Sequence, residues 1–494
     1  MNQSQVFLDE RVRIAAEAFQ FLKSTTIAER AVFMHAVADK IEGLGPELLA
    51  TAHAETALPL PRLTGEKART VGQWRSYANA VALGVYTEAR IDLANSETGK
   101  NDIRKFNLGI GPVVVFGASN FPFAFSTAGG DTASAIGAGC PVIVKGHSGH
   151  THTSTMMAEA IAAVIKDFGW PDGVFSHILG ANIEGTDTKI GAYLTGHPLV
   201  KAVGFTGSYW GGKALFDIAN QREEPIPVFA EMGSINPVFA FTHMLQERAE
   251  ALAKEYATSL TMGVGQFCTN PGVFIAVKGD GLDRFKNALA LEIAAIVPGT
   301  MLNTGIYEHF EKNKTTLSSQ EAVSVIAESG TEATQGQGRA RIISTSADNF
   351  LKNQVLSEEV FGPFAVLVEA ESEAEVLAIA QQLKGQLTIT FAGTKEDVQE
   401  HQDVFQAVKD KAGRLLFNGM PTGVEVVYAM QHGGPFPSCT DPRFTSVGPD
   451  AVKRFVRPLS FQNWPDEFLP EELKNENTLG ISRIVDGSAT KTSI

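Results

Sequence analysis

The chain has 494 residues, of which 44% are hydrophobic and 19% charged, enough apolar material for two or three globular domains. Its formal net charge of -14 argues against nucleic acid or an anionic membrane as a partner, because both require basic patches. The cysteines, Cys140, Cys268 and Cys439, are too few and too scattered for a disulfide framework or a structural zinc site, which fits a reducing cytoplasm. No apolar run reaches the roughly 20 residues of a membrane span.

The first 90 residues are expected to be helical, because apolar residues recur at helical spacing from Val12 to Leu22 and again from Ile27 to Ile41. Acidic residues among the first apolar ones indicate an amphipathic helix rather than a signal peptide. The polar stretch 94–107 is either a projecting β-hairpin or a loop, and its composition does not decide between the two.

Strands and helices then alternate. Strands are expected at 110–117, 142–145, 175–179, 202–206 and 227–231, and helices at 124–137, 151–168, 190–194 and 209–220. This alternation predicts right-handed βαβ units and a parallel sheet, in which ligands bind beyond the carboxyl ends of the strands. Polar candidates lie at those ends: Asn120, Lys145, residues 206–208 and Glu231.

A second α/β block is expected from about residue 235 to 418, with helices at 245–259 and 282–296 and a strand at 364–368. The tail from residue 419 is rich in glycine, proline and serine. Together these patterns predict an α/β protein built from two α/β units.

Cys268 occupies a short turn, 265–270, between an apolar run expected to be helical and a strand expected at 273–277. Gly263, Gly265 and Gly272 allow the backbone to bend closely there. A thiol in such a turn, close to helix-end amides, can be exposed and partly ionised, and the thiolate is the reactive form. The alternative is a small buried hydrophobic residue, as most free cysteines are.

The residues at the strand ends each have two interpretations. Lys145 either meets an anion or a ligand hydroxyl, or emerges into solvent. Burial is expected to raise the pKa of Glu231 toward that of a general base, unless a nearby cation pairs with it. Asn120 either donates to an oxyanion or caps the next helix.

Two further segments are candidates. Residues 204–212 run from a strand through a glycine turn into a helix whose free amides attract phosphate, or Ser208 merely caps that helix. His147, His150 and His152 lie close in sequence, but they lack a helical i, i+4 pair and no cysteine or acid completes a tetrahedral site. We therefore expect no metal.

Six segments between residues 119 and 363 resemble, in order, the motifs of the aldehyde dehydrogenase superfamily. They are Ser119-Asn120-Phe121-Pro122, Val144-Lys145, Phe205-Thr206-Gly207-Ser208, Glu231-Met232-Gly233-Ser234-Ile235-Asn236-Pro237, Gly265-Gln266-Phe267-Cys268 and Glu358-Glu359-Val360-Phe361-Gly362-Pro363. The resemblance extends across nearly the whole chain.

The resemblance implies a thiol chemistry. Cys268 would attack the aldehyde carbon, and the Asn120 amide with the Cys268 backbone N–H would hold the oxyanion. Hydride would then leave to a nicotinamide, and Glu231 would activate the water that hydrolyses the resulting thioester. The implied nucleotide contacts are Lys145 and Glu359 to the ribose hydroxyls, Gly207, Ser208 and Gly211 to the pyrophosphate, and Phe361 near the nicotinamide.

One departure from the family pattern concerns the cofactor. NAD-preferring members commonly have a glutamate three residues after the lysine, and here that position is Ser148. A missing carboxylate removes repulsion against a 2′-phosphate, and a hydroxyl can donate to it. The sequence therefore predicts NADP as cofactor, with NAD possibly tolerated.

The tail resembles the branch of bacterial 2-oxoglutarate semialdehyde (2,5-dioxopentanoate) dehydrogenases and NADP-linked fatty aldehyde dehydrogenases. In that branch a histidine reaches the catalytic cysteine, and His432 matches it, unless it lies exposed in its Gly/Pro loop. The first alternative implies sugar-acid catabolism and a cation for the substrate carboxylate, with Arg443 as a candidate. A CoA-acylating enzyme is disfavoured because Glu231 is present, and so is a non-catalytic nucleotide-binding scaffold.

The resemblance also implies a domain division. Residues 1–93 and 108–232 would form a Rossmann-like nucleotide-binding domain and 233–418 an α/β catalytic domain. Residues 94–107 and 453–494 would form a small oligomerisation hairpin and tail, giving a homodimer or homotetramer. Residues 419–452 would return to the nucleotide-binding domain and carry an active-site loop.

Overall fold

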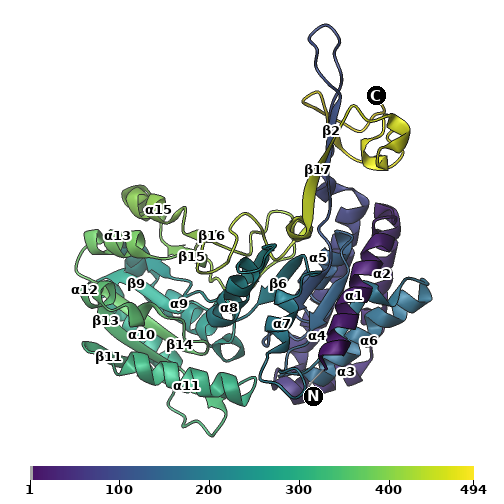
Figure 1. Cartoon of the computed structure of the whole chain (residues 1–494). Helices are drawn as coiled ribbons and strands as arrows, with labels where there is room; N and C mark the ends of the chain where they lie inside the picture. Colours follow the sequence, from purple (N-terminus) through teal and green to yellow (C-terminus); the bar gives the residue numbers. More distant parts are fainter. Residues whose placement is uncertain (1–3) are drawn as a thin grey trace.

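The computed structural model describes residues 4–494 and confirms the helices expected near the N-terminus. They are α1 (Gln5–Leu22), α2 (Ile27–Glu42), α3 (Pro46–Thr56) and α4 (Leu60–Ala82). Thr26 starts α2 through a capping box with Glu29, which satisfies backbone N–H groups that helix geometry leaves free. α2 packs against α4 and α6, on the right of Figure 1.

The first sheet has five parallel strands in the order β5-β4-β3-β6-β7. The strands are β3 (Val113–Phe116), β4 (Val142–Lys145), β5 (Phe175–Ile178), β6 (Ala202–Thr206) and β7 (Val228–Glu231). The helices between them are α5 (Gly130–Gly137), α6 (Thr151–Asp167), α7 (Ile190–Gly196) and α8 (Tyr209–Asn220). This confirms the predicted parallel α/β sheet. From β3 the chain adds β4 and β5 on one side and β6 and β7 on the other, so the order in which strands are added changes direction between β3 and β6.

Alternate side chains of this sheet enter two different cores. Val113 and Val115 pack in one hydrophobic cluster, whereas Val114 and Phe116 pack in another on the opposite face. Because strand side chains alternate in direction, a continuous run of β-branched residues fills both faces. The sheet is therefore the middle layer of three.

The second sheet has seven strands in the order β11-β13-β14-β9-β8-β15-β16, with only β11 antiparallel to its neighbour. The strands are β8 (Val238–Ala240), β9 (Val273–Val277), β11 (Val323–Glu328), β13 (Arg341–Ser346), β14 (Phe364–Ala370), β15 (Gln386–Ala392) and β16 (Ala412–Phe417). β10 (Gly299–Thr300) and β12 (Gln337–Gly338) pair separately. The helices are α9 (Thr242–Thr261), α10 (Asp280–Ala294), α11 (Thr304–Ser318), α12 (Ala347–Lys352), α13 (Glu373–Gln382), α14 (Lys395–Glu400) and α15 (Gln402–Val408).

A third sheet stands away from the two larger ones, at the top of Figure 1. Its order is β17-β2-β1-β18-β19, from β1 (Arg90–Asp92), β2 (Ile103–Gly109), β17 (Val456–Gln462), β18 (Arg483–Val485) and β19 (Ser488–Thr490). β1 and β2 pair antiparallel, and Asn95 bridges to Lys100 near the tip. Of the two alternatives for residues 94–107, the hairpin is therefore correct.

The expected helix 124–137 is wrong in its first half, because α5 begins only at Gly130. The preceding backbone is held differently: the buried carboxylate of Glu66 accepts from the N–H groups of Phe123 (2.8 Å) and Ala124 (3.0 Å). The strands expected at 110–117 and 175–179 are also shorter, at four residues each. None of the helices between residues 4 and 494 combines the length and apolar composition that a bilayer span requires.

The two large sheets approach each other through the ends of their strands and not through their edge strands. β7 ends at Glu231 and β8 begins at Val238, so the carboxyl edge of the first sheet faces the amino edge of the second. Cys268 comes shortly before β9 begins at Val273, on that same amino edge. Side chains from both sheets therefore converge on one crevice, consistent with ligand binding at strand ends.

Candidate active site

Cys268 lies in the turn between α9 and β9. The short 3-10 helix Met262–Gly265 leads into it, with a φ of 65° at Gly265, a conformation that glycine adopts readily. A Cβ atom on Gly265 would lie 2.3 Å from the carbonyl carbon of Gly362, so no larger residue fits. Val264 has a φ of 59°, which is strained for a β-branched residue.

A buried asparagine holds the cysteine turn. The side-chain amide of Asn236 donates to the carbonyls of Cys268 (2.8 Å) and Asn270 (2.9 Å). Its Oδ1 accepts from the hydroxyl of Thr388 on β15, at 2.9 Å. Because the carbonyls of the turn are tied to the second sheet, the thiol keeps a fixed position.

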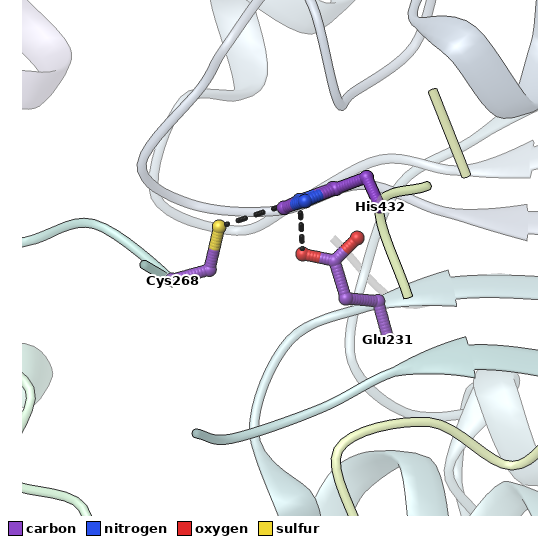
Figure 2. A group of neighbouring side chains, drawn as sticks. All are labelled: Glu231, Cys268 and His432. Carbon is purple, nitrogen blue, oxygen red and sulfur yellow. Dashed lines mark hydrogen bonds and ion pairs between the residues drawn. The ribbon is translucent and has the colours of Figure 1, made fainter. Parts of the chain in front are cut away.

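Three side chains from distant segments converge at this thiol (Figure 2). Nε2 of His432 lies 3.6 Å from Sγ of Cys268 and 2.9 Å from Oε1 of Glu231. The side chains of His432 and Glu231 are each 2% exposed, so His432 is not an exposed loop residue. Nε2 carries at most one proton, so it accepts the thiol proton only when it is not donating to Glu231.

The electrostatics of this cluster correct two predictions. Burial raises the pKa of the half-buried Cys268 thiol well above its usual value, and the charge of Glu231 raises it further, so the expectation of a partly ionised thiol is wrong. Burial also acts to raise the pKa of Glu231, but His432 and the Ser446 hydroxyl outweigh it and the pKa is lowered. The expected raised pKa is therefore wrong, because this carboxylate has a partner.

The loop that carries His432 packs backbone against backbone on the second sheet. A Cβ atom on Gly413 of β16 would lie 1.8 Å from the carbonyl oxygen of Gly433. The His432 N–H donates to Oγ1 of Thr445 (2.9 Å), and the Ser446 hydroxyl donates to Oε2 of Glu231 (2.7 Å). Sequence reasoning missed both hydroxyl residues, because single polar residues in a Gly/Pro-rich tail form no pattern.

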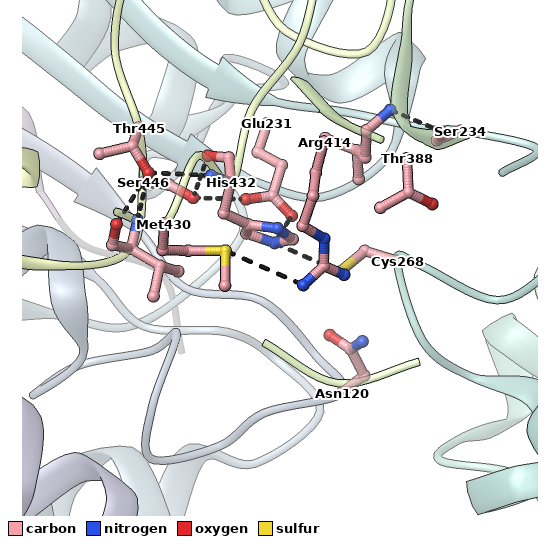
Figure 3. Close-up of polar contacts among 12 residues, drawn as sticks. Asn120, Glu231, Ser234, Cys268, Thr388, Arg414, Met430, His432, Thr445 and Ser446 are labelled. Atoms are coloured by element: carbon pink, nitrogen blue, oxygen red, sulfur yellow. Dashed lines mark hydrogen bonds and ion pairs between the residues drawn. The ribbon is translucent and has the colours of Figure 1, made fainter. Parts of the chain in front are cut away.

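Asn120 follows β3 and lies on the opposite side of the thiol from Glu231 (Figure 3). One N–H of its side-chain amide donates to the Gln266 carbonyl at 3.0 Å. The second N–H of that amide is left for another acceptor, such as an oxyanion. The helix-capping alternative for Asn120 is wrong, because Gly129 is the N-cap of α5.

Sequence reasoning also missed two arginines near the thiol. Arg414, on β16, places its guanidinium beside Cys268 (Figure 3), and its Nη2 donates to the carbonyls of Pro421 (3.0 Å) and Gly423 (3.1 Å). Arg69, on α4, lies over the ring of Phe125, 5.0 Å from its centroid. Neither stands in a segment with a recognisable motif.

Arg443, the candidate from the sequence for binding a substrate carboxylate, lies at the surface. Its side chain is 77% exposed and pairs with Asp441. The expectation for this residue is wrong, because its charge is already neutralised by its neighbour in the chain.

Lys145 and Ser148 lie at the carboxyl end of β4. Lys145 is half-buried, burial lowers its pKa, and its Nζ donates to the Gly146 carbonyl at 3.0 Å. Across the described part of the chain no carboxylate lies within ion-pair distance of this amine. Ser148 is exposed. A half-buried ammonium without a counterion fits a ribose hydroxyl or a phosphate as its partner.

Ser208 caps α8, because its Oγ accepts from the N–H of Gly211 at 3.2 Å. Gly207 and Ser208 are exposed, and the positive end of the helix dipole lies there. The capping alternative is therefore correct, and it leaves the first turn of α8 open to an anion such as a pyrophosphate.

Glu359 and Phe361 line a small cavity together with Gly265 and Phe267. The Glu359 carboxylate lies close over Gly233, where a Cβ atom would be 2.4 Å from Oε2. Burial raises the pKa of Glu359 to about 7. A buried carboxylate of this kind fits hydroxyl donors such as those of a ribose, so these residues and those at β4 and α8 suit a nicotinamide dinucleotide.

The three histidines of the first sheet do not gather around one point. The rings of His147 and His150 stack with centroids 5.2 Å apart, whereas His152 contacts Glu55. The group with suitable ligand atoms is instead Glu231, Cys268 and His432, whose ligand atoms lie within 4.8 Å of one another. The same three groups are suited to acid–base and nucleophilic chemistry.

Residues 2–458 match the model of the Aldehyde dehydrogenase family. The chain is 45% identical, over 98% of its length and 92% of the relative's, to alpha-ketoglutaric semialdehyde dehydrogenase 2 of Azospirillum brasilense. It is 43% identical, over 99% and 93%, to alpha-ketoglutaric semialdehyde dehydrogenase of Acinetobacter baylyi. The solved 1-pyrroline-5-carboxylate dehydrogenase from Thermus with bound NAD shares the fold, with a TM-score of 0.78 and 19% identity over 94% of this chain and 86% of that one. Because the family model spans nearly the whole chain and the fold agrees, the chain belongs to the aldehyde dehydrogenase family.

Proposed function

We propose that this protein oxidises 2-oxoglutarate semialdehyde (2,5-dioxopentanoate) to 2-oxoglutarate, with NADP as preferred oxidant, in sugar-acid catabolism. The observation that carries the proposal is the identity of 45% and 43%, over nearly the whole chain, to two relatives whose names state this substrate. Family membership accounts for the reaction type, the oxidation of an aldehyde with a nicotinamide nucleotide.

Cys268 is the proposed nucleophile. Its thiol proton passes to Nε2 of His432, 3.6 Å away, and the resulting imidazolium is stabilised by Glu231 at 2.9 Å. The sulfur then attacks the aldehyde carbon, and the free N–H of the Asn120 amide donates to the oxyanion of the thiohemiacetal. The link between Asn120 and Gln266 keeps that amide in place.

Glu231 and His432 serve the second half of the reaction. A bound nicotinamide would supply the acceptor for the hydride of the former aldehyde carbon, and Cys268 would then hold the acyl group as a thioester. Glu231 takes a proton from the water that attacks this thioester, the C–S bond breaks, and the imidazolium of His432 returns its proton to the leaving thiolate. The Ser446 hydroxyl, 2.7 Å from Oε2, keeps the carboxylate oriented.

Most of the proposed cofactor contacts lie at the carboxyl ends of two strands of the first sheet, β4 and β6. Lys145 and Ser148 meet the adenosine side and its 2′-phosphate, and Gly207, Ser208 and Gly211 meet the pyrophosphate at the start of α8. Glu359 holds ribose hydroxyls, and Phe361 packs near the nicotinamide. The family as a whole uses NAD or NADP, and the exposed Ser148 supports NADP because no carboxylate stands at that position.

A substrate panel with both nucleotides tests the proposal. We expect kcat/KM for 2,5-dioxopentanoate with NADP to exceed that for decanal by more than tenfold, with free 2-oxoglutarate as product and no dependence on CoA. A preference for decanal would instead favour the alternative, an NADP-linked fatty or broad-specificity aliphatic aldehyde dehydrogenase. CoA-dependent thioester formation would contradict the water-activating role of Glu231.

We also propose a homodimer or homotetramer in a reducing cytoplasm. The three cysteines are all free, and a nucleophilic thiol requires a reducing compartment to stay active. Residues 94–107 and 453–494, which contribute to the third sheet and its hairpin, are the proposed contacts between subunits.

A further inference from the structure

Three arginines close to the active site have no carboxylate partner anywhere in residues 4–494. Nη2 of Arg62 donates to the Asn120 carbonyl at 2.7 Å, and its buried Nη1 has no partner. Arg69 makes no hydrogen bond, and its Nη1 is also buried. Arg414 reaches two backbone carbonyls and, at 3.9 Å, Sδ of Met430.

Other buried arginines of this chain are held in two ways. Arg30 and Arg483 bond only to hydroxyl and backbone carbonyl oxygens, whereas two more pair with carboxylates. Arg454 pairs with Asp131 at 2.7 Å, and Arg104 pairs with Asp102 at 2.8 Å. A guanidinium keeps its charge in proteins, and a buried charge without a partner is costly. What distinguishes the arginines of the active site is their position near the reactive thiol, where a bound anion would supply the missing negative charge.

Two of the three lie near the reacting sulfur, Arg69 on helix α4 and Arg414 on strand β16. Arg69 lies over the Phe125 ring, whose centroid is 6.1 Å from that of His432, the residue in contact with Cys268. Arg414 comes from the second sheet and lies beside the thiol in Figure 3. Arg62 differs, because its contact with Asn120 makes it a positioning residue for the proposed oxyanion donor.

Nearby acids do not occupy these arginines. Glu66 lies between Arg62 and Arg69 on α4 without forming an ion pair with either: its Oε1 accepts from two backbone N–H groups, and its buried Oε2 has no hydrogen-bond partner. Glu425, whose charge reaches Arg414, is exposed. Glu231 is engaged by His432 and Ser446. The protein as a whole has a net charge of -14, which repels an anionic substrate at long range. Any affinity for a carboxylate must therefore come from local cations.

We propose that Arg69 and Arg414 bind the distal carboxylate of the substrate, so that the site selects ω-oxo carboxylates over uncharged aldehydes. The inference rests on the proposed function for the length of the substrate, but not for its charge. In an extended five-carbon substrate the carboxylate carbon lies roughly 5 Å from the aldehyde carbon, given C–C bonds of about 1.5 Å. Guanidinium groups within electrostatic reach of the sulfur suit that span.

The test compares Arg69→Met and Arg414→Met on a charged and an uncharged substrate. We expect kcat/KM for 2,5-dioxopentanoate to fall about 10- to 150-fold in each, the range for a lost hydrogen bond to a charged group. For pentanal, kcat/KM of each Met variant stays within about threefold of that of the wild type. Arg69→Lys and Arg414→Lys recover part of the lost kcat/KM for 2,5-dioxopentanoate. Arg443→Met, at the exposed arginine paired with Asp441, is the matched control with no effect on either substrate. An equal fall for pentanal would overturn the proposal, because the arginines would then act on the thiol or the fold.

A binding measurement keeps the inference testable without turnover. 2-Oxoglutarate should protect Cys268 of the wild type from alkylation by uncharged iodoacetamide. The Arg69→Met and Arg414→Met variants should need an at least about tenfold higher concentration of 2-oxoglutarate for the same protection. Equal protection in wild type and variants contradicts the proposal.

The two proposals can fail separately. If the wild type rejects 2,5-dioxopentanoate but oxidises succinate semialdehyde with the same dependence on both arginines, the carboxylate site stands and the proposed substrate is wrong. If the wild type prefers decanal and neither arginine matters, both are wrong.

Discussion

At the scale of single residues, burial and the charge of Glu231 both disfavour ionisation of the Cys268 thiol, the proposed nucleophile. Burial and the charge of Glu231 together raise the pKa of Cys268. The thiolate fraction therefore grows as the pH rises through the alkaline range. Glu231→Gln removes the charge and lowers the pKa of Cys268, so iodoacetamide should alkylate the variant at pH 7 about tenfold faster than wild type.

The pH profile of alkylation checks this prediction. Its rise should move to lower pH in Glu231→Gln, whereas Glu358→Gln, at an exposed acid, should leave it in place. A slower or unchanged rate in Glu231→Gln would mean that the proton path through His432, and not the charge, controls the thiol.

The proposed preference for NADP rests on Ser148. It is exposed at the end of β4, so substitution there is compatible with folding. Ser148→Glu introduces repulsion against a 2′-phosphate and an acceptor for ribose hydroxyls, and should lower the ratio of kcat/KM for NADP to that for NAD at least tenfold. Ser148→Ala, which removes only the hydroxyl, should change the ratio less. An unaltered ratio in Ser148→Glu would remove the support for NADP.

At the scale of elements, the contact between β16 and the 431–438 loop determines where His432 lies. A Cβ atom on Gly413 would overlap the carbonyl oxygen of Gly433, at 1.8 Å. Gly413→Ala must push this loop off the sheet, so kcat/KM should fall at least tenfold and the Tm should drop by several degrees. Gly419→Ala, where a Cβ atom meets nothing within 4 Å, is the matched control. Normal activity in Gly413→Ala would show that His432 is dispensable or that the loop adapts.

At the scale of the whole molecule, the third sheet has open edges, and the segment that follows β17 exposes apolar side chains. Trp464 is 52% exposed and Phe468 67% exposed, and β17 and β19 are edge strands with unpaired backbone groups. Such a surface is typical of a contact with another subunit. The division of the chain into domains and the oligomerisation role of these segments remain predictions.

Trp464→Ser combined with Phe468→Ser should weaken association between subunits. Light scattering coupled to gel filtration should then show a smaller mass than for the wild type at the same concentration. Leu291→Ser, at an exposed leucine on α10 (75% exposed), should leave the mass unchanged. An undiminished mass in the double variant would place the subunit contact elsewhere.

What the sequence determined by itself was local. The β-branched runs and glycine turns predicted the parallel strands, and the residues at their ends, such as Lys145 and Glu231, could be placed on one edge because parallel strands share a direction. The motifs identified the family, and the glycines around Cys268 predicted a tight turn. Each of these features depends on residues that are neighbours in the chain.

Only the tertiary structure decided which distant groups lie close to the thiol. The resemblance of the tail offered His432, 164 positions from Cys268, but left open whether it is exposed, and the structure shows it buried beside the thiol. Arg69 and Arg414 come from helix and strand segments without a motif. The pKa of Glu231 is lowered and not raised because its partner comes from the tail of the chain. A pKa depends on burial and on charges brought within a few ångströms by folding, and sequence spacing does not contain that information.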